Sequence, residues 1–291
     1  MAVDYCHRIK EGIATLHYQK VFVSSLHNAI ELFLKQRMLD ENNHKVANLY
    51  AVNDEKDALL QLDYFKSENL NEFFVNLSNS DRNKFRSVEF KNLKDISTKL
   101  IKDTLTNLNK DSIKDELELL QTLRNNETHF YITESNYLND EKFVKLHNLM
   151  VIVYQAMKDY GFLPFIGEAW AEYKKYDFSE QMIETYSLRE ALKNSRVVKS
   201  IVNVLDDQPL KYYGDEAYDI TELYFEIKDE RNILDTDYTF GDVFAVITLL
   251  KKYRCVCFEK EQTQDEDWVE GQYVSPIGEY VIHFNIDLEG E

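Results

Sequence analysis

Glycine, proline and cysteine are all scarce in this sequence. Its 291 residues include 8 glycines, 3 prolines and 3 cysteines, whereas average usage would supply roughly 20 glycines and 15 prolines. Few turns can be built from these residues, so we expect long secondary-structure elements. Neither GxGxxG nor GxxxxGK[ST] occurs. The usual glycine-rich phosphate-binding loops, and the nucleotide-driven chemistry that depends on them, are therefore excluded.

The sequence also lacks the signals of a disulfide framework, a metal site or a membrane span. Cys6, Cys255 and Cys257 cannot form a disulfide framework, and no second Cys or His pair offers metal-ligand spacing. No segment approaches the roughly 18 consecutive apolar residues of a membrane span, and the N-terminal MAVDYCHRIKEG has no pattern of a secretion signal. We therefore expect a cytoplasmic protein with no metal, no cofactor and no membrane contact.

Positive charge is deficient, and the deficit is uneven. The formal net charge is −18. Residues 195–291 contain 9 Lys and Arg against 22 Asp and Glu, a balance of −13, and residues 1–194 contain 25 against 30, a balance of −5. Because phosphate contacts need Lys and Arg, this charge argues against general adhesion to nucleic acid.

The distribution of glycine and proline indicates two domains. None of either residue occurs between Gly12 and Gly161, and apolar residues in this part recur at helical spacing. Helical patterns are predicted over residues 9–34, 59–65, 70–77, 93–108, 117–130 and 143–160. They predict a helical bundle over residues 1–165. A connecting segment with a helix over residues 179–195 follows, so that the segment spans residues 166–194.

The last part of the chain has a different pattern. Three short helices are predicted over residues 197–205, 218–227 and 239–253, followed by the strand RCVCFEKE, the strand QYVS and then PIGEYVIHF. This order resembles winged-helix proteins, which implies a smaller α+β domain over residues 195–291. The fold class is thus mainly α, a helical bundle followed by a winged-helix-like domain.

The wing of this domain is acidic, with Asp265, Glu266, Asp267 and Glu270. DNA binding is therefore not expected, and a module that contacts a protein or builds a dimer is favoured.

The segment LRNNETHFY, residues 123–131, contains the most informative motif. Arg124 is followed by Asn125, His129 comes five positions after Arg124, and Tyr131 is two further on. This pattern resembles the signature of HEPN domains, and Tyr131 extends the resemblance to HEPN toxins that are paired with nucleotidyltransferase antitoxins. The resemblance implies a helical bundle, ribonuclease activity and a homodimer in which both motifs line one cleft. It also implies a role as a toxin or phage-defence effector, with Tyr131 as a site that an antitoxin modifies.

The chemistry of the motif can be considered without the family. Five positions correspond to about 140° on an ideal helix, so Arg124 and His129 share a face only if the turn loosens, and the adjacent asparagines are poor helix formers. Asn125 and His129 do share a face. A histidine exchanges protons near neutral pH and an arginine binds phosphate. We expect metal-independent RNA cleavage by attack of the ribose 2′-OH. His129 would act as general acid or base, Arg124 would neutralise phosphoryl charge and Asn125 would orient the histidine or a phosphate oxygen.

Alternatives remain at each of these positions. Arg124 is also consistent with a solvated surface arginine and His129 with a helix-terminal histidine, although the HEPN interpretation is preferred for both. For Tyr131 an ordinary packed tyrosine is the favoured interpretation. Residues 81–115 carry nine Lys and Arg against six acids. They are either an RNA track, in which Lys99 and Lys102 are the first candidates, or a solvated helix face. The alternative function is a non-catalytic scaffold or regulator whose acidic C-terminal domain binds a protein partner.

Overall fold

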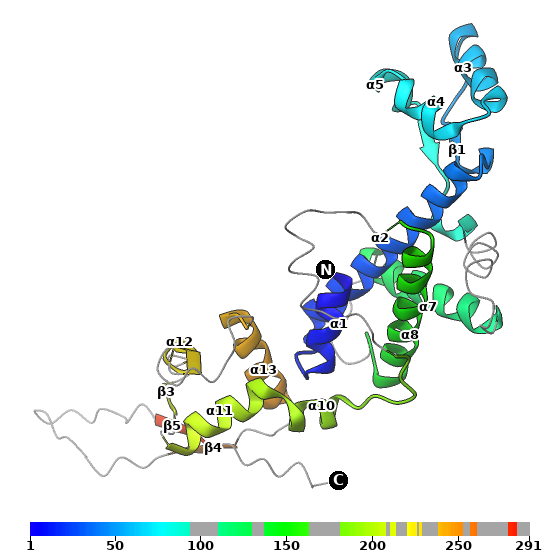
Figure 1. Cartoon of the computed structure of the whole chain (residues 1–291). Helices are drawn as coiled ribbons and strands as arrows, with labels where there is room; N and C mark the ends of the chain where they lie inside the picture. Colours follow the sequence, from blue (N-terminus) through cyan, green and yellow to red (C-terminus); the bar gives the residue numbers. More distant parts are fainter. Residues whose placement is uncertain are drawn as a thin grey trace, which may run out of the picture. The chain divides into compact units, whose positions relative to one another are not determined.

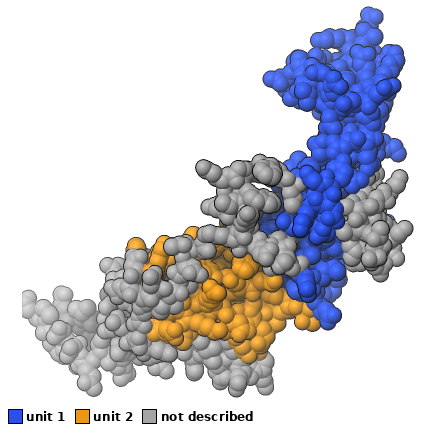
Figure 2. All heavy atoms as spheres, in the orientation of Figure 1, with its two compact units in different colours: residues 1–3, 20–184 blue, residues 4–19, 185–291 orange. Residues whose placement is uncertain are grey.

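The chain is mainly helical. A computed structural model describes residues 1–93, 110–129, 137–162, 181–207, 210–213, 220–225, 227–228, 238–252, 257–260 and 279–283 (Figure 1). Within these ranges α-helices predominate over a few short strands, so the expected mainly α class is confirmed. The chain divides into two compact units, coloured separately in Figure 2: unit 1 comprises residues 1–3 and 20–184, and unit 2 comprises residues 4–19 and 185–291.

This division differs from the boundaries expected from composition. Residues 4–19 group with unit 2, although the sequence pattern places them in a bundle over residues 1–165. The physical reason is that Ile13 belongs to the buried core of unit 2 and Tyr18 packs against it. Local composition carries no information about packing partners that lie more than 170 residues away in the chain.

Unit 1 is organised around long helices. They are α2 (Leu16–Asp40), α7 (Lys110–His129) and α8 (Asp140–Asp159). The Phe22 and Phe143 rings lie 6.0 Å apart near the starts of α2 and α8, and the Arg37 guanidinium lies 4.1 Å from the centre of the Tyr160 ring near their ends. These two helices therefore run side by side in the same direction.

Helix starts in this glycine-free part are set by capping side chains. Asp54 accepts a hydrogen bond from the backbone N–H of Asp57 at 2.8 Å, at the start of α3 (Glu55–Lys66). Asn139 accepts one from the N–H of Lys142 at 2.9 Å, at the start of α8. Each cap satisfies a backbone donor that has no partner within its helix. Short polar residues thus fix where these helices begin.

A small aromatic module lies between α2 and α7 in the order of the chain. Figure 1 shows it at one end of α2. Its elements are η1 (His44–Val46), β1 (Ala47–Leu49), α3 (Glu55–Lys66), α4 (Leu70–Asn76), α5 (Asn79–Arg82) and β2 (Phe85–Ser87). Strands β1 and β2 pair antiparallel, with Ala47 opposite Ser87. The Tyr64 side chain is fully buried at the centre, and its hydroxyl donates to the His44 carbonyl at 2.8 Å. Helices α3 and α4 confirm the patterns predicted over residues 59–65 and 70–77.

The opening helix predicted over residues 9–34 is in fact two helices. Helix α1 (Ala2–Lys10) ends before Gly12, and α2 starts at Leu16. Gly12 has a φ of +89°, a conformation that favours glycine, and the Ile13 N–H bonds back to the Arg8 carbonyl at 2.9 Å. Periodicity missed the break because apolar residues continue in helical register across it.

Unit 2 combines helices with a three-stranded sheet. Its elements after α1 are α10 (Leu188–Asn194), α11 (Arg196–Asp207), β3 (Leu210–Tyr213), α12 (Ile220–Phe225), α13 (Phe240–Lys252), β4 (Cys257–Lys260) and β5 (Glu279–His283). The strand order is β3-β5-β4, and both pairings are antiparallel, with Leu210 and Phe258 opposite Ile282.

The predicted elements of unit 2 are confirmed in part. Helices α11, α12 and α13 and strand β4 lie where the patterns place them. Strand β3 was not predicted, the strand predicted at QYVS lies outside the described residues, and β5 begins within the segment PIGEYVIHF. The helix predicted over residues 179–195 was wrong in extent, because residues 181–187 are not helical and α10 starts after its N-cap Ser187.

A buried carboxylate joins the N-terminal segment to α13. Asp242 accepts hydrogen bonds from the Thr239 backbone N–H at 2.7 Å and from the Tyr18 hydroxyl at 2.7 Å, and it forms an ion pair with Arg8. The Asp242 N–H in turn donates to the Thr239 hydroxyl at 3.3 Å, which completes a reciprocal capping box at the start of α13. The N-terminal residues are thus part of the structure of unit 2.

Candidate functional site

The motif predicted from the sequence lies on α7 of unit 1. The core-facing stripe of this helix contains Ile113, Leu117 and Leu120, all buried. Arg124 follows at the next position of the same stripe, about 20° from Ile113 around the axis, and is partly buried. Its position on the core side explains why its guanidinium acts electrostatically on His27 of α2.

The expected loosening of the helix between Arg124 and His129 does not occur. Residues 110–129 form one continuous α-helix, and the adjacent asparagines at 125 and 126 are helical. Because tertiary packing of the apolar stripe outweighs the weak helix propensity of two residues, the turn stays regular. His129 is the last residue of α7 and is displaced by about 140° from Arg124 around the axis.

Asn125 and His129 lie on the opposite side of α7 from the core. Asn125 is exposed, as are Glu118 and Thr122 on that side. His129 is four positions after Asn125 and hence on the same face, which confirms that these two residues share a face. The His129 side chain lies outside the described side chains. Within one chain, Arg124 and Asn125 therefore leave the helix in different directions.

A buried histidine lies next to the motif arginine. The His27 side chain is 5% exposed, its ring centre is 4.1 Å from that of Phe90, and its Nδ1 lies 3.7 Å from a carboxylate oxygen of Glu31. Burial lowers the pKa of His27 below its ordinary value; the Glu31 charge opposes this shift and the Arg124 charge adds to it. Burial and the Arg124 charge thus both favour the neutral form of the His27 imidazole.

The neighbourhood of His27 extends along α2 to the aromatic module. Lys35 donates to Glu31 at 2.5 Å and to the Ser87 hydroxyl at 2.9 Å. His27 was not singled out from the sequence. The spacing of His27 and Glu31, four positions apart with apolar residues on either side, is the signal that could have identified this pair.

The remaining predicted site residues cannot be placed. Tyr131, Lys99 and Lys102 lie outside the described residues. Within the described part of the chain, no group of three or more His, Cys, Asp and Glu residues could hold a metal ion. No helix in these ranges is long and apolar enough to cross a membrane.

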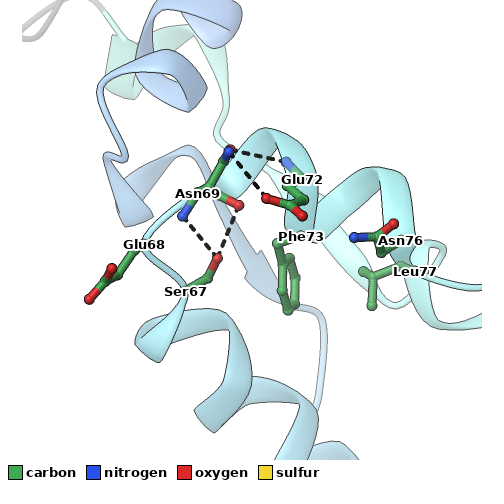
Figure 3. Close-up of a pocket in the computed structure, with 7 residues that line it drawn as sticks. All are labelled: Ser67, Glu68, Asn69, Glu72, Phe73, Asn76 and Leu77. Atoms are coloured by element: carbon green, nitrogen blue, oxygen red, sulfur yellow. Dashed lines mark hydrogen bonds between the residues drawn. The ribbon is translucent and has the colours of Figure 1, made fainter.

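A pocket of about 420 Å³ lies in the aromatic module rather than at the motif (Figure 3). Its polar groups are engaged with one another: the Asn69 side chain accepts from the Glu72 N–H at 3.1 Å, and the Ser67 hydroxyl donates to the Asn69 carbonyl at 3.0 Å. These bonds cap the start of α4. We therefore interpret the polar groups of this pocket as part of the α3–α4 turn.

Comparisons with known proteins give no relative from which a role could be inferred: no protein-family model, no curated protein and no solved structure matches this chain.

Proposed function

We propose that this protein is a metal-independent endoribonuclease of the HEPN type. The observation that carries the proposal is the sequence of Arg124, Asn125 and His129 on one helix of an α-helical unit, with Arg124 partly buried and Asn125 exposed. A cation to bind phosphate and an imidazole to move protons are the groups that such a reaction needs.

In the proposed reaction the 2′-OH of RNA attacks the adjacent phosphorus and the bond to the 5′ oxygen breaks. His129 takes the proton from the 2′-OH or delivers one to the leaving oxygen. Arg124 neutralises charge that grows on the phosphoryl oxygens, and Asn125 orients the imidazole or a phosphate oxygen. The products carry a 2′,3′-cyclic phosphate and a 5′-OH. DNA is not a substrate, because it lacks the nucleophile.

The regular geometry of α7 favours a site made from two copies of the chain. Because Arg124 lies on the core-facing stripe and His129 is about 140° away, one chain presents the two side chains in different directions. A twofold axis that brings the end of α7 against its symmetry mate places the arginine of one copy beside the histidine of the other. A homodimer is therefore part of this proposal, as is a role as a toxin or phage-defence effector that a protein partner restrains.

The test is incubation of the purified protein with total RNA in the presence of EDTA, beside His129→Ala and Arg124→Ala variants. We expect both variants to cleave at least about 100-fold more slowly than the original protein. Glu118→Gln is the matched control, since Glu118 is exposed on the same helix and has no role in the reaction. Equal cleavage by the original protein and His129→Ala, or cleavage by neither, contradicts the proposal.

A second candidate function is a non-catalytic regulator. It is supported by the balance of −13 over residues 195–291 and by the order helix, strand, helix, helix, strand, strand from α11 to β5, which is the order of a winged-helix domain. An acidic domain of this type suits contact with a protein better than contact with DNA. The RNA assay distinguishes the two candidates, because a regulator cleaves nothing.

A further inference from the structure

Helix α13 of unit 2 has an aromatic solvent-facing side. Its opposite side carries Val243, Val246 and Leu250 in the core of the unit. Among residues 240–250, whose burial the structure describes, the exposed positions are 240, 241, 244 and 248, which hold Phe, Gly, Phe and Thr. Phe240 and Phe244 keep 40% and 48% of their surface exposed, although large aromatic side chains are normally covered in a folded protein.

The exposed rings of α13 are linked to α12 through the Tyr224 ring. The Phe240 and Phe244 rings are stacked with centres 6.4 Å apart, and Phe240 meets Tyr224 edge-on at 5.7 Å. Tyr224 contacts Phe225, which is 52% exposed, also at 5.7 Å. We call Phe225, Phe240 and Phe244 the aromatic patch. Contiguous exposed apolar surface of this kind marks an interaction site, because covering it is favourable.

The position of the patch argues against nucleic acid as its partner. In helix-turn-helix and winged-helix proteins, the corresponding helix carries polar and basic side chains into a DNA groove. Here the solvent-facing positions between residues 240 and 250 of α13 carry Phe, Gly and Thr and no cation. Lys228 lies over the Tyr224 ring at 5.2 Å, and its ammonium donates to the Tyr224 hydroxyl at 2.8 Å. Residues 195–291, whose charge balance is −13, also repel a polyanion.

Charge also decides between a second copy and a different partner. A contact between two copies of the patch brings two regions of −13 together, which is repulsive. A partner with apolar anchors one helical turn apart and Lys or Arg around them matches both the rings and the negative charge balance of residues 195–291. We propose that the aromatic patch is the docking surface for a basic, amphipathic helical segment of another protein. This inference does not depend on the ribonuclease activity.

The probe that tests it is a fluorescein-labelled 18-residue peptide with Leu and Trp along one helical face and Lys at the other positions. A peptide of the same composition in scrambled order is its control. Fluorescence anisotropy with the full-length protein is expected to give at least tenfold tighter binding of the amphipathic peptide than of the scrambled one. The affinity should fall as salt rises from 50 to 500 mM.

Variants localise the binding. Phe240→Ser with Phe244→Ser is expected to weaken binding at least tenfold, whereas Phe65→Ser is expected to leave it unchanged. Phe65 is a matched control because it is a phenylalanine in unit 1 with 55% exposure. Circular dichroism melts confirm that each variant is folded.

Three results overturn the proposal. One is equal binding of the amphipathic and scrambled peptides, or binding of neither. A second is competition by a single-stranded or duplex oligonucleotide at the concentration of the peptide, which assigns the patch to nucleic acid. The third is a concentration-dependent dimer that Phe240→Ser with Phe244→Ser abolishes, which assigns the patch to a second copy.

Discussion

The Asp242 carboxylate interacts with Thr239, Tyr18 and Arg8 while it is almost completely inaccessible to solvent. Burial, with the Asp242 hydrogen bond and charge, raises the pKa of the Tyr18 hydroxyl, so Tyr18 stays a hydrogen-bond donor at neutral pH. A buried charge of this kind is tolerated only when its lone pairs are satisfied. Single side chains in unit 2 therefore control the attachment of the N-terminal segment.

Glu11 provides a test in the acid range. Burial by itself would raise the pKa of the Glu11 carboxyl, but hydrogen bonds from His7 and Tyr238 and the charges of His7 and Arg196 hold it below its ordinary value. A lowered folded-state pKa contributes stability above the unfolded value and loses it as pH falls through the folded value. Tyr238→Phe should cost about 1.5–3 kcal/mol at pH 7, with a smaller cost below about pH 4. Urea denaturation at pH 7 and pH 3.5 measures both; a cost independent of pH contradicts this assignment.

His27 provides the corresponding test near neutrality. Because burial lowers its folded-state pKa, the unfolded chain binds more protons as the pH falls below about 6.5. The free energy of unfolding should therefore decrease between pH 7.5 and pH 5.5, and His27→Gln should reduce this decrease. The control is His17→Gln, an exposed histidine on the same helix. Denaturation curves with the same pH dependence in both variants would show that His27 is not the group responsible.

At the scale of elements, most helices were predictable, and the short strands β1, β2 and β3 were not. Helices α7 and α8 and the helices of unit 2 have many periodic positions, whereas β1, β2 and β3 have three or four residues each and too little pattern to detect. The motif of the candidate site was found from residue spacing. Its geometry was not, because the regular turn at Asn125 depends on packing of the whole α7 stripe. The His27 environment depends on contacts between α2 and residues far along the chain.

Two glycines that follow helices allow the cost of an added Cβ to be compared. Gly12 and Gly161 both have positive φ, +89° and +72°. A Cβ at Gly12 would meet backbone atoms of Leu192 at 3.1 Å, whereas one at Gly161 would meet nothing within 4 Å. Gly161→Ala should cost about 1–2 kcal/mol from the backbone conformation alone, and Gly12→Ala should cost about 1–2 kcal/mol more because the neighbouring backbone must move. Thermal and urea denaturation of the two variants compare the costs; a Gly161 variant at least as destabilised would contradict the close approach at Gly12.

For the whole molecule, the proposed activity is a property of an assembly. Helix α7 presents Arg124 and Asn125 on different sides of one chain, and in the proposed dimer a complete site would take its arginine and histidine from two copies. The net charge of −18 adds a constraint, because the dimer must offer RNA a local cationic path despite general repulsion. The number of chains that make up one active site is therefore as informative to measure as the effect of a mutation.

Mixing two inactive variants tests this arrangement. Arg124→Ala and His129→Ala proteins are each expected to be inactive, but a heterodimer of the two contains one site in which both groups are intact. After subunit exchange in an equimolar mixture, random pairing should restore about a quarter of the original ribonuclease activity. The control is the same mixture assayed before exchange. Activity that stays at the level of the separate variants after exchange would show that the arginine and histidine act within one chain.

The grouping of residues 4–19 with the end of the chain has a consequence during synthesis. Arg8 leaves the ribosome first, but Asp242 is added 234 residues later, a delay of roughly 10 to 50 s at ordinary elongation rates. Throughout that interval Ile13, which is inaccessible in the finished fold, lacks part of the core that covers it. The segment of residues 4–19 therefore completes its packing only after the last helices of unit 2 have been made.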